Sequence, residues 1–145
     1  MSTAPARARP ADLQALADAG WAVVLAARSE PSLDRTAQQC ATSGADTLVV
    51  VADVTDSQQV DGVLAAALQR FGRIDAIVTT AAAVAYGRFE DVPAEIFDRS
   101  IAINLLGTAN VARAAFGHFR KVGGGHLVLT GSLLGKIAVP FMSSY

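Results

Sequence analysis

The chain has 145 residues, a formal net charge of −1 at neutral pH and 52% hydrophobic residues. This length predicts one domain, and the apolar content allows a sizeable core, which argues against disorder. The charge is small and the basic residues do not cluster, so nucleic acid and anionic membranes are poor candidates for partners. The single cysteine, Cys40, excludes an internal disulfide and fits a reducing compartment, so we expect a cytoplasmic protein.

Two kinds of segment alternate along the chain after residues 1–10, which show neither pattern and are expected to form a flexible tail. Short continuous apolar runs predict buried strands at residues 21–27, 47–52, 74–80 and 126–130. Longer segments with apolar residues at helical spacing predict helices at residues 11–19, 31–42, 55–71 and 93–121. Strands that are apolar on both faces and joined by helices imply a parallel sheet covered on both sides.

Capping residues support the limits of these helices. Gly20, Gly44 and Gly72 follow the first three, where a left-handed residue can end a helix. Thr55 and Gln58 form a capping-box pattern, which predicts the start of the third helix. Along one side of the long helix runs an apolar stripe consisting of Phe97, Ile101, Leu105, Ala109, Ala112, Phe116 and Phe119.

Five short motifs occur in a fixed order along this alternating pattern. They are Leu25–Ser29, Ala52–Asp56, Phe71–Asp75, Asn104–Thr108, and Gly131–Ser132 with Ser144–Tyr145. In this order and spacing they resemble the short-chain dehydrogenase/reductase family, over roughly residues 11–145. The resemblance implies an α/β fold, a Rossmann-like parallel sheet with helices on both faces that binds a dinucleotide.

The chain departs from the family's pattern in three places. Residues 4–10 contain no glycine, whereas the family begins with a strand and a Gly-rich turn. The Asn-Asn-Ala-Gly signature is replaced by Thr79–Ala82, and the family's Lys would lie beyond Tyr145. We therefore expect residues 11–145 to form an incomplete, truncated Rossmann-type domain. If nothing replaces the first strand, strands 21–27 and 74–80 are expected to pair directly, giving the order 3-2-4-5 in the family's strand numbering.

The resemblance assigns catalytic roles to three residues. Ser132 would hydrogen-bond the substrate oxygen, Tyr145 would transfer the proton, and Asn104 would hold a water in a proton relay. A tyrosine phenol has an unperturbed pKa of about 10, which the family's Lys lowers. Losing a tuned general acid–base typically costs about 10²–10⁴-fold in rate. Read without the resemblance, Ser132 is a turn residue at a strand end and Asn104 an exposed helix residue.

The resemblance also implies the cofactor and its contacts, which would involve Arg28, Ser29, Asp53, Val54, Thr79 and Ala81. Arg28 follows a strand whose end approaches the adenosine ribose, where an Arg can pair with a 2′-phosphate. NADP is therefore favoured over NAD. Asp53 would contact the adenine. The alternatives are that Arg28 is a solvated loop residue and that Asp53 belongs to a turn.

Two functional hypotheses follow from these expectations. The first is an oxidoreductase that transfers a hydride between NADP(H) and a ketone or secondary alcohol. The second is a catalytically inactive relative or fragment that acts by association through helix 93–121, the segment through which a homo-oligomer would also form. No metal is expected, because His118 and His126 have no acid or cysteine partner at metal-ligand spacing. The apolar run 21–27 is too short to span a bilayer.

Overall fold

The computed structural model describes residues 13–142 apart from 14, 17 and 43. The expected tail and Tyr145 therefore lie outside the described residues. The chain divides into two compact units, with the boundary between Asp75 and Ala76. Both units combine parallel strands with helices, which confirms the predicted α/β class.

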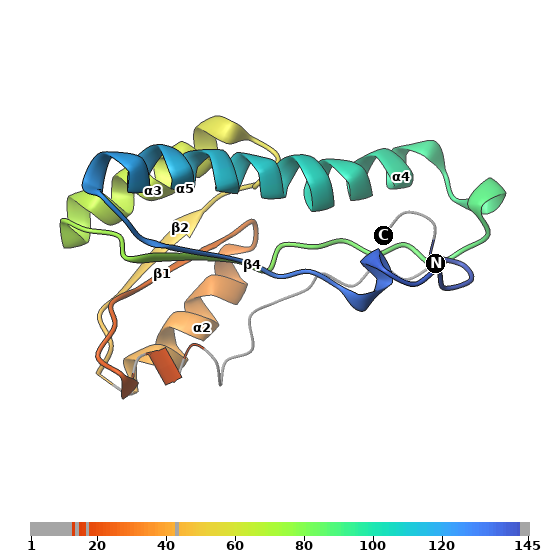
Figure 1. Ribbon diagram of the computed structural model, residues 1–145. Helices are drawn as coiled ribbons and strands as arrows, with labels where there is room; N and C mark the ends of the chain where they lie inside the picture. Colours follow the sequence, from red (N-terminus) through yellow and green to blue (C-terminus); the bar gives the residue numbers. More distant parts are fainter. Residues whose placement is uncertain (1–12, 14, 17, 43, 143–145) are drawn as a thin grey trace. The chain divides into compact units, whose positions relative to one another are not determined.

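The first unit is a strand–helix–strand–helix segment (Figure 1). It consists of β1 (Val23–Ala27), α2 (Glu30–Ala41), β2 (Thr47–Val51) and α3 (Ser57–Phe71). The two strands pair in parallel, with Val23 opposite Thr47 and Ala27 opposite Val51. Helix α2 contacts both strands and α3 contacts β2. The predicted strands 21–27 and 47–52 are thus confirmed, each slightly shorter than expected.

Alternating residues of β1 form the core of this unit. Val23 and Leu25 are buried together with Leu33 of α2, and Ala37 and Val49 pack against them. Burying side chains of this size contributes about 1.5–3 kcal/mol each. Cys40 is buried on the same helix, and desolvation raises the pKa of its thiol.

Helix α3 begins one residue later than its capping pattern predicted. Its N-cap is Asp56, whose carboxylate accepts hydrogen bonds from the backbone N–H groups of Gln58 at 2.9 Å and Gln59 at 3.3 Å. Thr55 is not the cap, and its hydroxyl donates to Asp53 Oδ1 at 2.8 Å. The expected end is confirmed: Gly72 has φ 76° and its N–H donates to the Leu68 carbonyl.

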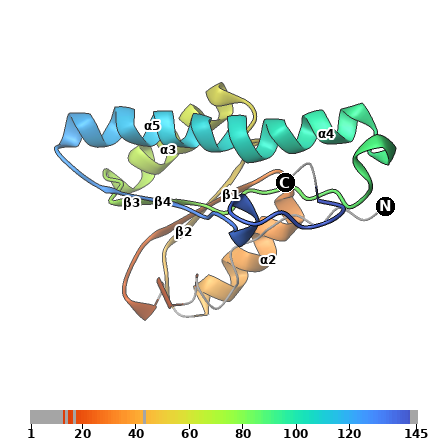
Figure 2. The same ribbon diagram turned by 45° about the vertical axis from the view of Figure 1, so that its right-hand side comes forward.

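The second unit contains the remaining elements. They are β3 (Ala76–Thr79), the 3₁₀ turn η1 (Phe89–Asp91), α4 (Ala94–Ile101), the π-helical segment η2 (Ala102–Gly107), α5 (Thr108–Val122), β4 (His126–Leu129) and the 3₁₀ turn η3 (Leu133–Gly135). From α4 to α5 the chain forms one continuous helical rod (Figure 2). Strands β3 and β4 pair in parallel, with Thr79 opposite Leu129, and α5 contacts both.

The long helix buries a stripe that shares Phe119 with the one its sequence suggested and differs at its other buried positions. The buried residues are Ser100, Ile103, Gly107, Val111, Ala115 and Phe119. From the predicted stripe, Leu105 and Phe116 are each 61% exposed. The π-helical segment contributes to this difference because its wider turn shifts the register of the residues that follow it.

Two of the predicted strand neighbours lie within one unit each, and both are confirmed. The pairs 3-2 and 4-5 of the family's numbering are present as β2–β1 and β4–β3, but they form two separate two-stranded sheets. The expected direct pairing of strands 21–27 and 74–80 would join the two units and stays a prediction.

Candidate functional site

Parallel pairing brings two predicted cofactor segments to one edge of the first unit. Arg28 and Ser29 follow β1, and Asp53 and Val54 follow β2. The strands stay paired up to that edge, since the N–H of Ala52 donates to the Ala27 carbonyl at 3.0 Å. The four residues therefore share the carboxyl edge of the β1–β2 sheet, where ligands of open α/β sheets bind.

Arg28 and Ser29 have side chains suited to an anion. Arg28 is exposed and its guanidinium forms no ion pair with another residue in the described part of the chain. Ser29 is the N-cap of α2, but its side chain makes no capping hydrogen bond. A positive charge and a hydroxyl beside a helix N-terminus fit a phosphate group.

Asp53 organises the turn between β2 and α3. Its Oδ1 accepts hydrogen bonds from the N–H of Thr55 at 2.9 Å and from the Thr55 hydroxyl, while its own N–H donates to Gln59 Oε1 at 2.9 Å. Gln59 Nε2 in turn donates to Asp56 Oδ2 at 2.9 Å. Together with the N-cap bonds, this lowers the pKa of the Asp56 carboxyl. Asp53 thus has a defined structural role, and its contact with adenine remains a prediction.

In the second unit the carboxyl ends of β3 and β4 also meet at one edge. Thr79 ends β3 and is buried, and its carbonyl accepts the N–H of Thr130 at 3.1 Å. Ala81 lies in the segment that follows β3, and Ser132 follows β4. The pairing thus places the segments of Thr79, Ala81 and Ser132 at the same sheet edge.

Asn104 clamps the segment after β3 to the long helix. Its Oδ1 accepts the N–H of Ala83 and its Nδ2 donates to the carbonyl of the same residue, both at 2.9 Å. Asn104 lies in the π-helical segment η2, a feature that is frequent at functional sites. The side chain that was expected to hold a water is therefore engaged with the backbone. The sequence could not reveal this partner, which lies 21 residues away.

Ser132 presents an oriented hydroxyl at the start of η3. Its Oγ accepts the N–H of Leu134 at 3.2 Å, and the residue is exposed. A hydroxyl oxygen that accepts a backbone N–H still has its own proton to donate. This geometry suits hydrogen bonding to a carbonyl oxygen. Tyr145, the expected proton donor, lies outside the described residues.

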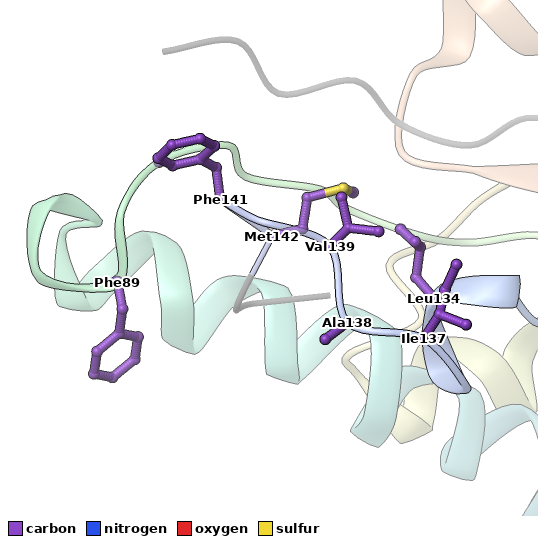
Figure 3. A pocket seen from close by; sticks show the side chains of 8 residues that line it. Phe89, Leu134, Ile137, Ala138, Val139, Phe141 and Met142 are labelled. Atoms are coloured by element: carbon purple, nitrogen blue, oxygen red, sulfur yellow. The ribbon is translucent and has the colours of Figure 1, made fainter.

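A pocket of about 460 Å³ lies beside η3 in the same unit. Its apolar walls are drawn in Figure 3 and include Phe89, Leu134, Ile137, Val139, Phe141 and Met142. The family resemblance had suggested that Phe141 and Met142 line a substrate loop, with ordinary packing as the alternative, and both residues lie at this pocket. The only local signal is the unusual density of apolar residues in a segment, 133–142, that forms no regular strand or long helix.

Among the described residues there is no group of three or more His, Cys, Asp or Glu side chains that could hold a metal ion. None of the helices described is both long and apolar enough to cross a membrane.

Comparison with known proteins identifies relatives across nearly the whole chain. The family model described as short chain dehydrogenase matches residues 12–145. Versicolorin reductase 1 of Aspergillus parasiticus is 34% identical over 119 residues, which are 81% of this chain and 45% of that protein. Dehydrogenase/reductase SDR family member 7 of Homo sapiens is 31% identical over 134 residues, which are 90% of this chain and 40% of that protein.

Solved structures show the same similarity. A short-chain type dehydrogenase/reductase from Mycobacterium marinum has a TM-score of 0.86 at 33% identity. The matched region comprises 92% of this chain and 55% of the Mycobacterium marinum protein. An alcohol dehydrogenase from the archaeon Thermococcus sibiricus, complexed with 5-hydroxy-NADP, has a TM-score of 0.84 at 27% identity. Here the matched region comprises 97% of this chain and 60% of the alcohol dehydrogenase. The chain thus spans about half the length of the proteins it matches.

Proposed function

Because this chain belongs to the short-chain dehydrogenase/reductase family, we propose that it acts as an oxidoreductase that transfers a hydride between NADP(H) and a ketone or secondary alcohol. The observation that carries the proposal is the oriented Ser132 hydroxyl at the carboxyl edge of β3–β4, where Asn104 also fixes the neighbouring segment. Versicolorin reductase and the alcohol dehydrogenase are relatives whose names describe reactions of this class.

The cofactor and the chain would supply different parts of the reaction. Bound NADPH would supply the hydride that reaches the carbonyl carbon. Ser132 would donate a hydrogen bond to the carbonyl oxygen, on which negative charge develops as the hydride arrives. Tyr145 would donate the proton that converts this oxygen to a hydroxyl. Asn104 would act as a positioning residue, because its amide already binds Ala83.

The preference for NADP over NAD rests on Arg28. Its charge is exposed and unpaired among the described residues, at the sheet edge that also carries Asp53. A 2′-phosphate would gain a charge-assisted hydrogen bond there, whereas the 2′-hydroxyl of NAD would not. Solved relatives include an NAD⁺-bound xylitol dehydrogenase as well as the NADP-type complex, so the choice depends on this chain's own residues.

Titration of the chain with NADPH, followed by the fluorescence of the nicotinamide, tests the proposal. We expect saturable binding in the micromolar range. Arg28→Ala should weaken NADPH binding at least tenfold and change NADH binding less than twofold. Arg35→Ala is the matched control, since Arg35 is exposed in the same unit but donates to the Pro31 carbonyl. Absence of binding at millimolar NADPH would refute the proposal.

The second candidate function is a catalytically inactive relative that acts by association through helix 93–121. It is favoured by the exposure of Leu105, Leu106 and Phe116 on the rod formed by α4, η2 and α5. The same surface would support a homo-oligomer of an active enzyme, in a cytoplasmic location. Sedimentation tests the association: Phe116→Glu should dissociate the assembly, and an unchanged sedimentation coefficient would exclude this surface.

A further inference from the structure

One amide side chain, that of Gln59, links the segment after β2 to the start of α3. Its Oε1 accepts the N–H of Asp53 at 2.9 Å, and its Nε2 donates to Asp56 Oδ2 at 2.9 Å. Asp53 lies six positions before Gln59 in the chain, and Asp56 is the N-cap of α3. Gln59 thus holds the backbone of the turn from its helical side.

The chemistry of an amide matches both partners of Gln59. An amide has an oxygen that accepts and a nitrogen that donates. The backbone N–H of Asp53 needs the acceptor and the carboxylate of Asp56 needs the donor, so one orientation of the amide satisfies both. A glutamate at position 59 would have no proton to donate and would bring a like charge to the Asp56 carboxylate. The position therefore favours glutamine over an acid of the same length.

The bond from Asp53 to Gln59 fixes a residue at the carboxyl edge of the β1–β2 sheet. Asp53 directly follows Ala52, whose N–H still donates to the Ala27 carbonyl of β1. The Asp53 carboxylate is fixed as well, because its Oδ1 accepts the N–H and the hydroxyl of Thr55. A carboxylate can accept about four hydrogen bonds, so these contacts are compatible with a further bond from an amino group of a ligand.

We propose that Gln59 is a positioning residue for the adenine of the cofactor and acts through Asp53. The inference rests on the proposed function, with its predicted contact between Asp53 and adenine, and adds a residue that sets the preference for this base. A carboxylate accepts a hydrogen bond from the 6-amino group of adenine, whereas the 6-oxo group of hypoxanthine is itself an acceptor and is disfavoured beside it. By holding Asp53 in place, Gln59 contributes to the discrimination between these two bases.

A double-mutant cycle tests this role by exchanging the amide and the carboxylate. Gln59→Glu removes the donor to Asp56. Asp56→Asn places two amides side by side, and whichever way they turn, one donor meets another donor. The double variant restores every donor–acceptor pair with the two groups exchanged, and asparagine is as good an N-cap as aspartate. The probes are adenosine 2′,5′-bisphosphate and inosine 2′,5′-bisphosphate, whose dissociation constants are measured by calorimetry.

Each single variant should weaken binding of the adenosine ligand about threefold to tenfold, the effect of one lost hydrogen bond. Each should also reduce the preference of the parent chain for the adenosine ligand over the inosine ligand, a ratio that a change in stability alone would not move. The double variant should restore both quantities to within about twofold of the parent. Gln58→Glu is the matched control, because it adds the same charge at the adjacent exposed position, and it should leave the base preference unchanged.

An effect of charge alone predicts a different pattern. Asp56→Asn removes a negative charge, so charge alone would strengthen the binding of a ligand that carries phosphates. Stronger binding in Asp56→Asn would therefore overturn the inference. So would a double variant that stays as weak as Gln59→Glu, equal affinities of the parent chain for the two ligands, or an equal loss of base preference in Gln58→Glu.

The outcome is separable from that of the proposed function. Adenosine 2′,5′-bisphosphate lacks the nicotinamide, so its binding does not depend on hydride transfer. The expected cycle without NADPH binding would keep the role of Gln59 at an adenine-nucleotide site and refute the oxidoreductase. NADPH binding with no loss in the single variants would keep the oxidoreductase and refute the role of Gln59, and absence of binding of either ligand would refute both.

Discussion

Removal of the Asn104 amide should lower the local stability of the segment after β3 more than it lowers the stability of the whole chain. Asn104→Ala leaves both the N–H and the carbonyl of Ala83 without their partner, each now bonded at 2.9 Å. An unsatisfied buried polar group costs about 1–3 kcal/mol. Ala83 is only half-buried, so water replaces part of the loss. We therefore expect a total loss of about 1–2 kcal/mol from the pair.

Amide hydrogen exchange at Ala83 measures this loss directly. A change of about 1.4 kcal/mol corresponds to a factor of ten in an equilibrium constant, so exchange should accelerate roughly 5–30-fold in Asn104→Ala. Asn110→Ala is the matched control, since the Asn110 side-chain oxygen accepts a 3.5 Å bond from Arg113 within the same helix. Unchanged exchange at Ala83, or equal acceleration in both variants, would refute the clamp.

Replacement of Asn104 by Asp adds a pH dependence whose sign follows from the same geometry. A carboxyl can donate to the Ala83 carbonyl only when it is protonated, so the folded state raises the pKa of the new group above its unfolded value of about 3.9. The stabilising contribution of the protonated form is complete below the unfolded pKa and is lost as the pH rises through the folded pKa. Urea unfolding of Asn104→Asp should therefore show greater stability near pH 4 than at pH 7, relative to the parent chain.

Three further predictions concern the first unit. Gly72→Ala should lower the free energy of unfolding, measured in urea, by about 1 kcal/mol. Gly72 has φ 76° at the end of α3, and an added Cβ would meet no neighbouring group within 4 Å, so the cost comes from the backbone conformation. Burial raises the pKa of the Cys40 thiol, so a thiol reagent at pH 8 should react with it far more slowly in the folded chain than in urea, and equal rates would contradict its burial. Hydrogen bonds from Gln59 and Gln58 lower the pKa of the Asp56 carboxyl. The stability that ionised Asp56 contributes to the fold is therefore complete above the unfolded pKa of 3.8 and is lost as the pH falls through the folded pKa. In Asp56→Ala, the free energy of unfolding should depend less on pH in the acid range, as measured by urea unfolding.

Local chemistry determined much of the fold from the sequence alone. Continuous apolar runs such as residues 47–52 form strands because they are buried in a parallel pair, and the glycine after α3 adopts a left-handed conformation that other residues resist. The order of five short motifs was sufficient to indicate the family, which the match over residues 12–145 confirms. Each of these features is marked by adjacent residues in the sequence, so the sequence was sufficient to predict it.

Other features depended on contacts between residues far apart in the sequence. The exposed side of the long helix follows from the packing of α5 on β3 and β4. Only the tertiary structure joined Asn104 to Ala83 and closed the pocket with the bridge between Gly87 and Met142. The physical reason is that a polar side chain can form hydrogen bonds with several different groups. Its partner is the group that the packed tertiary structure places within hydrogen-bond distance.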